Sequence, residues 1–330
     1  MKPYLDLRRA SQLYFILFYL VAGVFFYKAV TLLPTIGAEA LTYRFPAVEA
    51  FLPISALLAL KQWLVYGVWD HLHPAGLTIL VLAILSALLF KRGFCSHLCP
   101  VGTVSELAFQ LRLKAFPHKI RIHPFLHYAL LTPKYLILGF FLYVIIYAMP
   151  APAVVSFLQS PYNAVSDVKM LKFFTDPSAL TLQVVAVLVV ISLIIPNFWC
   201  RYLCPYGALL NLFAFLSPLA LRRNASTCTN CKSCDRACPN GLTISTATAV
   251  TSTECTFCQS CIKACPHQST LTIQSRLGSK SLTPLLYSSL VVGLFVAGIG
   301  AAKLLGRWES PLLGQLWVTF VPMLDTLVHP

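Results

Sequence analysis

All twelve cysteines of this 330-residue chain belong to spaced groups that could bind metal. Two runs have the pattern Cys-x2-Cys-x2-Cys-x3-Cys-Pro, at residues 228–239 and 255–266. Each run supplies four thiolates, and two neighbouring runs are the bacterial ferredoxin arrangement for a pair of [4Fe-4S] clusters. A pair of zinc sites is the competing interpretation, but zinc modules typically use Cys-x2-Cys pairs. The spacing therefore favours iron–sulfur clusters.

In a double run of this kind, the fourth cysteine of each repeat ligates the cluster held mainly by the other repeat. The predicted ligands of cluster one are Cys228, Cys231, Cys234 and Cys265. The predicted ligands of cluster two are Cys255, Cys258, Cys261 and Cys238. Because such clusters pass one electron at a time, the double run predicts an electron-transfer path.

The other four cysteines form two Cys-x3-Cys-Pro motifs, Cys95 with Cys99 and Cys200 with Cys204. The motifs are copies within an internal repeat at an offset of 105 residues. If the two copies pack around a pseudo-two-fold axis, the four thiols converge in one cage that suits an Fe–S cluster, zinc or Cu(I). A redox-active dithiol pair and buried structural cysteines are the alternatives.

Proline residues define the elements that position these short motifs. Pro100 and Pro205 disfavour an α conformation at the preceding cysteine but suit the first turn of a new helix. We therefore expect each cysteine pair to lie in a turn at the membrane face. Interfacial helices are expected to follow at residues 100–115 and 205–221.

The composition excludes a soluble globular protein, because 58% of the residues are hydrophobic, 11% are charged and the mean hydropathy is +0.74. Stretches long enough to span a bilayer occur at 12–33, 74–91, 135–153, 179–198 and 283–305. We predict an all-α integral membrane protein with about five transmembrane helices in two hairpin repeats. The predicted protein also contains a small cytoplasmic bacterial-type 2[4Fe-4S] ferredoxin domain.

The predicted domain organisation has four parts. Residues 1–115 form the first transmembrane repeat and residues 116–221 the second, each ending in its Cys-x3-Cys-Pro motif. Residues 222–275 form the ferredoxin domain, and residues 276–330 form the fifth transmembrane helix and an outer tail.

Basic residues are distributed unequally along the chain. Segments 1–11, 91–134 and 199–282 hold 18 of the 25 Lys and Arg residues but only 4 of the 11 acids. The positive-inside bias therefore predicts a multi-pass protein of the bacterial inner membrane, with the N-terminus and ferredoxin domain cytoplasmic and the C-terminus outside. The net charge of +14 is then a topology signal and not a nucleic-acid-binding feature. The bases expected to face anionic lipid headgroups are Lys91, Arg92, Arg112, Lys114, Lys119, Arg121, Arg222 and Arg223.

Oxidation of a quinol releases two protons as well as two electrons, so an electron path that begins at quinol needs a proton acceptor. Asp70, His71 and His73 are candidate acceptors on the outer side, because a perturbed His or carboxylate can titrate near neutral pH. Plain interfacial polar groups are the alternative. The chain has no Cys-x-x-Cys-His sequence, so haem c is not expected.

The combined motifs, over about residues 75–270, resemble the NapH/NosR-type membrane polyferredoxins and are most similar to NapH. The resemblance implies a quinol dehydrogenase subunit of anaerobic respiration, which passes electrons from the quinone pool to other redox subunits of a membrane complex. A periplasmic ferredoxin-like subunit, a cytochrome or a reductase is the implied partner. Members of this family typically have four spans, so the predicted fifth span departs from the pattern.

Two other functions are compatible with the sequence. The related CcoG group carries the same cysteine motifs, which implies a copper reductase or an assembly factor for a respiratory oxidase. Chains of that group normally add an immunoglobulin-like domain at the C-terminus, and this sequence shows none. A redox-sensing membrane regulator is a further alternative, although no DNA-binding segment is visible.

Overall fold

The computed structural model describes residues 3–115, 123–267, 269–276 and 280–327. The chain divides into two compact units, of which unit 1 comprises Met1–Ile16, Ala83–Leu138 and Val184–Phe295. Unit 2 comprises Leu17–Leu82, Gly139–Gln183 and Val296–Pro330. All twelve cysteines belong to unit 1, so the candidate metal chemistry is confined to that unit.

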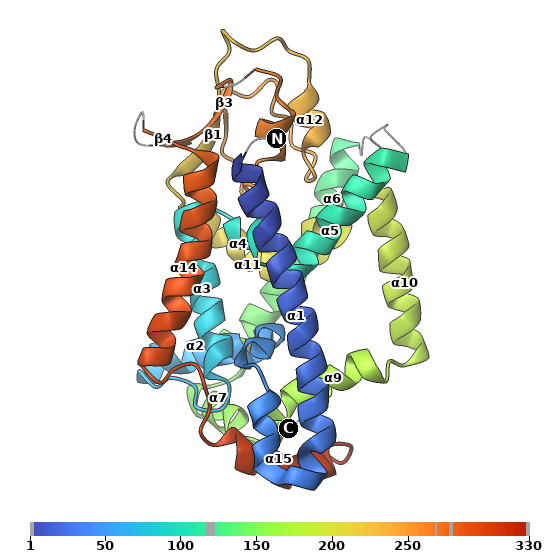
Figure 1. The fold of residues 1–330 in the computed structure, drawn as a ribbon, viewed down its shortest axis with the longest axis vertical. Helices are drawn as coiled ribbons and strands as arrows, with labels where there is room; N and C mark the ends of the chain where they lie inside the picture. Colours follow the sequence, from blue (N-terminus) through green and yellow to red (C-terminus); the bar gives the residue numbers. More distant parts are fainter. Residues whose placement is uncertain (1–2, 116–122, 268, 277–279, 328–330) are drawn as a thin grey trace. The chain divides into compact units, whose positions relative to one another are not determined.

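Most of the described chain is helical (Figure 1). Its first elements are α1 (Pro3–Ile36), η1 (Gly37–Tyr43), η2 (Pro46–Phe51), α2 (Pro53–Tyr66), α3 (Pro74–Phe90), α4 (Gly93–His97), α5 (Pro100–Ala115) and α6 (Pro124–Tyr143). The middle elements are η3 (Val144–Ala148), α7 (Ala151–Leu158), α8 (Pro161–Ala164), α9 (Ser166–Thr175), α10 (Ala179–Ile194), η4 (Trp199–Leu203) and α11 (Pro205–Ala214). The last elements are β1 (Leu219–Arg223), α12 (Ser233–Ala237), β2 (Ala249–Val250), α13 (Ser260–Ala264), β3 (Leu271–Ser275), β4 (Ser281–Leu282), α14 (Pro284–Leu304), α15 (Leu313–Phe320) and η5 (Val321–Met323).

Three helical segments of the described chain are long and apolar enough to cross a membrane: Leu7–Tyr43, Phe125–Ala148 and Pro284–Leu304. A fourth results if α9 and α10, which are bent by 75°, count as one broken span. Helix α3 is apolar but has only 17 residues, or about 26 Å at 1.5 Å per residue. The structure therefore supports a membrane protein, while the predicted total of five spans stays a prediction.

The predicted spans agree with the helices to different degrees. The predicted segment 12–33 lies within the helical span Leu7–Tyr43, and the segment 283–305 nearly coincides with Pro284–Leu304. The segment 135–153 is shifted, because the helix begins earlier and ends at Ala148. Met149 is extended before Pro150, which lacks the N–H that a continuing helix needs. The Nζ of Lys61 donates to the carbonyls of Ile145 and Met149, both at 2.6 Å, and so stabilises this helix end.

The prediction that each cysteine pair lies in a turn was only half right. Cys95 lies in the short helix α4 and Cys200 in η4, whereas Cys99 and Cys204 are non-helical and directly precede the next helix. Helices α5 and α11 begin at Pro100 and Pro205. The predicted helix 205–221 is too long, because α11 ends at Ala214 and residues 219–223 form a strand. Pro218 disfavours helical backbone at Ser217, which separates the two elements.

The small antiparallel sheet has the strand order β2-β1-β3-β4. Leu221 of β1 is paired with Val250 on one side and Ile273 on the other. Strand β1 begins before the predicted domain boundary at residue 222, and β4 ends after the boundary at 275. The boundary predicted at residue 116 lies outside the described residues.

Unit 2 has hydrophobic cores of its own. The largest surrounds the fully buried Trp317 of α15, whose ring contacts Phe26 and whose Nε1 donates to the carbonyl of Ala164 at 3.2 Å. A second core joins α2 to α7 through Leu58 and Leu158. These cores hold in place the loops that carry Asp70, His71 and His73.

Candidate metal centres

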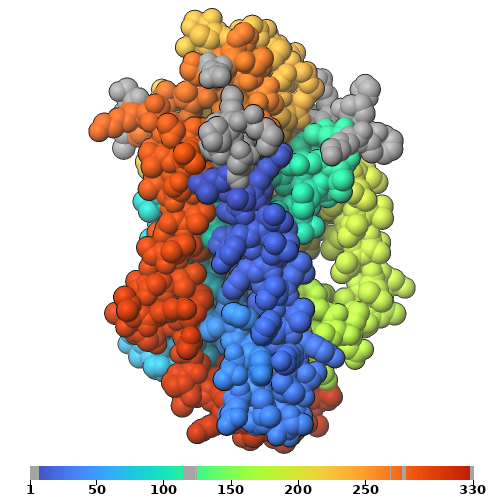
Figure 2. Space-filling view, viewed as in Figure 1, coloured from blue at the N-terminus to red at the C-terminus, as the bar shows by residue number. Residues whose placement is uncertain are grey.

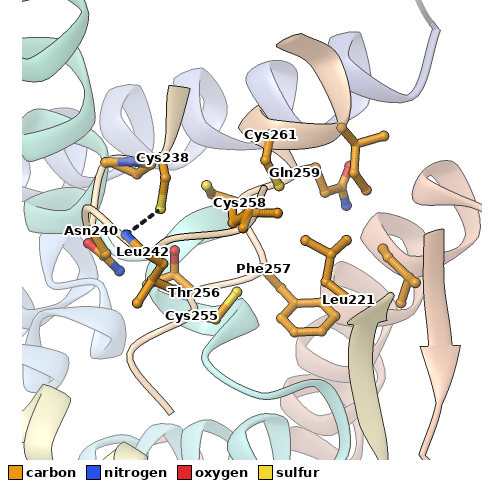
Figure 3. A pocket seen from close by; sticks show the side chains of 14 residues that line it. Leu221, Cys238, Asn240, Leu242, Cys255, Thr256, Phe257, Cys258, Gln259 and Cys261 are labelled. Atoms are coloured by element: carbon orange, nitrogen blue, oxygen red, sulfur yellow. Dashed lines mark hydrogen bonds between the residues drawn. The ribbon is translucent and has the colours of Figure 1, made fainter. Parts of the chain in front are cut away.

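The four cysteines predicted for cluster two line one cavity of unit 1. Figure 3 shows the side chains of Cys238, Cys255, Cys258 and Cys261 around this cavity. Leu221 and Ile273, paired neighbours in the sheet, form part of its apolar wall. The cavity therefore combines three cysteines of the second run with the last cysteine of the first.

A second cavity holds the other set. It is lined by Cys228, Cys231, Cys234 and Cys265, together with the basic residues Arg223, Lys232 and His267. Helices α12 and α13 pack against each other between the two cavities. Each helix carries the third cysteine of its run and is followed by the fourth, which is why the last cysteine of each run reaches the other cavity.

The cysteine loops share an unusual backbone conformation. Asn230 and Lys232 in the first run have positive φ values of 54° and 56°, and Phe257 and Gln259 have 51° and 61° at the corresponding positions of the second. Non-glycine residues adopt this conformation only where the surrounding structure requires it, commonly at ligand clamps. Alternating left-handed and right-handed residues direct backbone N–H groups into a concave anion site, which suits a cluster of sulfide and thiolate ligands.

The Cys-x3-Cys-Pro motifs come together in a third site, which we call the four-cysteine site (Cys95, Cys99, Cys200 and Cys204). Helix α5 of the first repeat packs against η4 of the second, and Ser105 Oγ lies 3.5 Å from Cys200 Sγ. Burial raises the pKa of the Cys99 thiol, and the neighbouring thiols of the site raise it further. Burial likewise raises the pKa of Cys200 to about 12.

Both glycines of the repeat, Gly102 and Gly207, are required by close approach. A Cβ atom on Gly102 would lie 2.1 Å from the carbonyl oxygen of Cys95, closer than any real contact allows. A Cβ on Gly207 would lie 2.7 Å from Nη2 of Arg92. The Gly207 N–H also points at Cys204 Sγ, 3.3 Å away. The clash with backbone makes glycine necessary at position 102, whereas a side chain at position 207 would displace the guanidinium of Arg92.

Arg92 is the basic residue of the four-cysteine site. Its side chain is 1% exposed, and its buried Nε has no hydrogen-bond partner among the described residues. Burial alone lowers the pKa of Arg92, but the charges of Cys95 and Glu254, and then of Cys204 and Cys200, raise it above its ordinary value. Arg92 therefore stays cationic near the four thiols.

Glu254 lies at the centre of a buried polar cluster next to Cys255. Its Oε1 accepts hydrogen bonds from Lys134 Nζ at 2.6 Å and Asn211 Nδ2 at 2.8 Å, and its Oε2 lies 3.4 Å from Arg92 Nη1. Burial by itself raises the pKa of Glu254, but the positive charges of Arg92 and Lys134 lower it below the ordinary value. The carboxylate therefore stays ionised and holds residues of both repeats together.

The ligand sets fit iron–sulfur clusters by their chemistry. Each ferredoxin-type cavity is lined by four cysteines, which is the ligand set of a [4Fe-4S] cluster. The four-cysteine site likewise offers four thiols, with the buried cation Arg92 nearby. In the part of the chain that the structure describes, no group of three His, Cys, Asp or Glu side chains that could hold a single metal ion was found.

The candidate proton acceptors lie in unit 2. Asp70 and His73 are buried, whereas His71 is exposed. His73 Nδ1 is 3.5 Å from Glu49 Oε1, and its Nε2 donates to the carbonyl of Asn163 at 2.7 Å. Burial by itself lowers the pKa of His73, but Glu49 and Asp167 raise it to about 9. Burial raises the pKa of Asp70, whose Oδ2 has no hydrogen-bond partner among the described residues.

Arg44 completes this buried ionic cluster. It contacts Glu49 and Asp167, both at 2.8 Å, and all three side chains are less than 5% exposed. The two cations, Arg44 and protonated His73, balance the two carboxylates. The sequence alone did not indicate this cluster, because Asp167 is 123 positions from Arg44. Glu49 is only five positions from Arg44, but nothing in that short segment marked the two residues as buried partners.

Some predicted lipid contacts were wrong. Lys91, Arg92 and Arg112 are buried instead of facing headgroups. Lys91 Nζ donates to the carbonyls of Thr251 and Ser252 at 2.8 and 3.2 Å, so it fastens the cluster domain to the end of α3. Lys119, Arg121 and the side chain of Lys114 lie outside the described residues.

Glu254 was not among the residues predicted from the sequence. One sequence feature could have indicated it, because it directly precedes Cys255 in a domain that has few acids.

Comparison with known families agrees with the three cysteine sites. A 4Fe-4S binding domain matches residues 72–120 and again residues 176–224. A 4Fe-4S dicluster domain matches residues 220–266. The first domain thus occurs once in each copy of the internal repeat, and each occurrence contains one Cys-x3-Cys-Pro motif.

Several known proteins are similar to the chain. The putative electron transport protein YccM of Escherichia coli (strain K12) is 39% identical over 327 residues, which cover 98% of this chain and 91% of YccM. The uncharacterized protein MJ0750 of Methanocaldococcus jannaschii is 30% identical over 172 residues, covering 50% of this chain and 66% of that protein. The methylamine utilization ferredoxin-type protein MauN of Paracoccus denitrificans is 28% identical over 174 residues, covering 52% and 56%. No solved structure matches the chain significantly.

Proposed function

Because the chain belongs to the family of YccM and is an iron–sulfur electron transport protein, we propose that it relays electrons between the quinone pool and a partner redox protein. The candidate membrane spans support contact with a lipid-soluble carrier. The finer relationship to the NapH/NosR group, with its quinol dehydrogenase activity, is part of this proposal.

The observation that carries the proposal is the division of eight cysteines between two cavities. Each cavity is lined by three cysteines of one run and the fourth cysteine of the other. We assign Cys228, Cys231, Cys234 and Cys265 as ligands of one [4Fe-4S] cluster. Cys255, Cys258, Cys261 and Cys238 are assigned to the other. When bound, each cluster supplies a centre that takes up and releases one electron.

We assign the four-cysteine site to a third cluster. Support comes from the shared position of the four thiols, the nearby buried cation Arg92 and the 4Fe-4S binding domain matched in both repeats. Arg92 then offsets the negative charge of four thiolates, and the backbone around Gly102 and Gly207 keeps the ligands close. Glu254 connects this site to Cys255, so the four-cysteine site and cluster two are neighbours in the path.

For the proton chemistry we propose that Asp70 is the proton acceptor in quinol turnover, with His71 at the surface. Because the raised pKa of His73 keeps it protonated near neutral pH, His73 would act as a cation beside Asp70 and not as the acceptor. Their burial beside Glu49 and Arg44 gives them the perturbed environment that an acid–base group needs. The same cluster also has a purely structural explanation, since its two cations balance two carboxylates. A variant that loses quinol activity without losing stability separates these two roles.

The copper-handling alternative would use the same four thiols. Soft thiolate ligands suit Cu(I) as well as Fe–S clusters. The 4Fe-4S binding domain matched in both repeats favours the electron relay. In keeping with the charge distribution, we propose that the N-terminus and the cluster domain lie on the cytoplasmic side of the bacterial inner membrane and the C-terminus outside.

Changing Cys204 to Ser tests the relay. We expect the variant, purified without oxygen, to keep the signals of the two ferredoxin-type clusters while losing the third centre and the quinol-dependent reduction of the other two. Ser105→Ala, at 3.5 Å from Cys200 Sγ but with no ligand role, is the matched control. Wild-type reduction by quinol in Cys204→Ser would remove the four-cysteine site from the electron path.

A further inference from the structure

The two ferredoxin-type cavities differ in their access to solvent. Cys231, in the first cavity, is exposed, whereas Cys238 and Cys261, in the second, are buried. The segment 224–232 around the first cavity is almost entirely exposed. In Figure 2 the residues of this domain, coloured gold and orange, lie at the surface of the molecule. The site of cluster one is therefore the solvent-facing end of the domain.

The exposed charges of this domain all have the same sign. Residues 219–282 contain two acids and seven Lys or Arg residues. Both acids are used inside the domain: Asp235 accepts from the backbone N–H groups of Ile244 and Ser245, at 2.6 and 2.9 Å, and Glu254 belongs to the buried polar cluster. The bases are Arg222, Arg223, Lys232, Arg236, Lys263, Arg276 and Lys280.

Two of these bases, Arg223 and Lys232, line the first cavity together with His267. Two others lie on the helices that carry cysteines of the two runs. Arg236 lies on α12, and Lys263 lies on α13, which packs against α12. Within the described residues, Lys232, Arg236 and Lys263 are exposed and form no ion pair with a carboxylate. The positive charge at this end is thus available to an external partner.

We propose that this basic face around the site of cluster one, formed by Lys232, Arg236, Lys263 and His267, is the docking surface for a small acidic electron-carrier protein. The inference rests on the proposed electron relay and adds to it the chemistry of one partner. Opposite charges would steer the carrier to the face and orient its redox centre toward the solvent-facing cysteines. Binding would be transient and would weaken as salt screens the charges.

The loop composition favours a protein partner over a lipid surface. A segment that rests on a membrane combines bases with large apolar or aromatic side chains at headgroup level. Residues 224–233, with the sequence Asn-Ala-Ser-Thr-Cys-Thr-Asn-Cys-Lys-Ser, contain no such side chain. Small polar residues of this kind permit close approach of another protein surface and offer hydrogen bonds at its rim.

The exchange at this face is a simple electron transfer. One electron passes between the carrier's cofactor and the iron–sulfur centre, so that one is oxidised as the other is reduced. No bond is made or broken and no proton moves. A partner at this face meets the chain on the side of the membrane where the cluster domain lies, so any partner on the opposite side must use another surface.

The test uses the full, cluster-loaded chain in nanodiscs of zwitterionic lipid. Stopped-flow absorbance would measure the second-order rate of electron exchange with a reduced acidic plant-type ferredoxin as the probe. We expect the rate to fall as ionic strength rises, and to fall about tenfold at low salt in a Lys232→Glu/Arg236→Glu variant. The single variant Lys263→Glu, which lies outside the first cysteine run, repeats the test if the first variant loses cluster one. Lys303→Glu, outside the domain, is the control.

The outcomes separate the two proposals. If iron content and reduction by dithionite are normal but the ferredoxin rate shows neither salt dependence nor a charge-reversal effect, the docking surface is wrong and the relay stands. If the wild-type chain contains no iron–sulfur clusters, the electron relay itself is contradicted. If charge reversal changes the rate of electron exchange only in nanodiscs with anionic lipid, the basic face binds the membrane and the docking proposal is overturned.

Discussion

Arg92 and Glu254 form a buried ion pair, with Nη1 3.4 Å from Oε2, that connects the four-cysteine site to the residue preceding Cys255. The two residues are 162 positions apart in the chain. Both are ionised, since a guanidinium keeps its proton at all ordinary pH values and Glu254 faces the two cations Arg92 and Lys134. The pair thus fixes the position of the cluster domain relative to the Cys-x3-Cys-Pro motifs within unit 1.

Changing Arg92 to Gln should lower the midpoint potential of the third centre. A reduced cluster carries one more negative charge than an oxidised cluster, and a nearby cation stabilises the reduced form. We expect a shift of about −60 mV, which corresponds to a tenfold change for a one-electron couple. A redox titration followed by EPR measures it, and Arg92→Lys should restore most of the shift. An unchanged potential in an intact Arg92→Gln centre would show that Arg92 acts only in packing.

Gly102 to Ala should disrupt the four-cysteine site. The added Cβ would overlap the carbonyl oxygen of Cys95, so the backbone of α5 has to move away from the thiols. We expect loss of the third centre and a lower unfolding temperature. Gly139→Ala is the matched control, because no atom lies within 4 Å of a Cβ there and alanine favours the helix. Equal behaviour of the two variants, in iron content and thermal unfolding, would contradict the close-approach argument.

Changing Cys238 to Ser should damage the cluster held mainly by the second run, although Cys238 belongs to the first. The reason is that Cys238 lines the cavity of Cys255, Cys258 and Cys261. Cys265→Ser should have the reciprocal effect on the other cluster. EPR spectra and iron analysis of the two variants distinguish the clusters. Damage confined to the cluster of the same run in both variants would refute the exchange of ligands.

The stability of unit 2 should depend on pH through His73. Its pKa is raised from 6.5 in the unfolded chain to about 9, so its contribution to stability is fully present below about pH 6.5. That contribution should be lost as the pH rises through about 9, because the neutral ring no longer balances Glu49 and Asp167. The difference in thermal unfolding between the wild type and His73→Gln, measured from pH 6 to about pH 10, isolates this group. A constant difference would mean that His73 is neutral throughout.

The cysteine spacing made most of the candidate sites predictable. A Cys-x2-Cys-x2-Cys-x3-Cys-Pro run contains its own ligand geometry, and the exchange of the fourth cysteine follows from the run itself. The internal repeat likewise predicted that Cys95, Cys99, Cys200 and Cys204 share a site. Prolines predicted where α5 and α11 begin, because a fixed φ and a missing N–H act locally.

Other predictions failed where local signals compete with tertiary contacts. Residues 215–221 were predicted to be helical, yet residues 219–223 form a strand. Strands β2 and β3 supply hydrogen-bond partners on both sides of it. Lys91 and Arg92 were predicted to contact lipid headgroups, because a basic residue at the end of an apolar span usually does so. The structure buries both because carbonyls and a carboxylate from the cluster domain lie opposite them.

The sequence by itself determined the membrane character, the repeat and the sets of cysteines, since composition and spacing are properties of neighbouring residues. Only the tertiary structure decided which charges are buried and what balances them. Arg92 with Glu254, and Arg44 with Asp167, are partners because folding brings distant segments together, and a buried charge is stable only beside an opposite one. No local pattern in the chain records these two pairings.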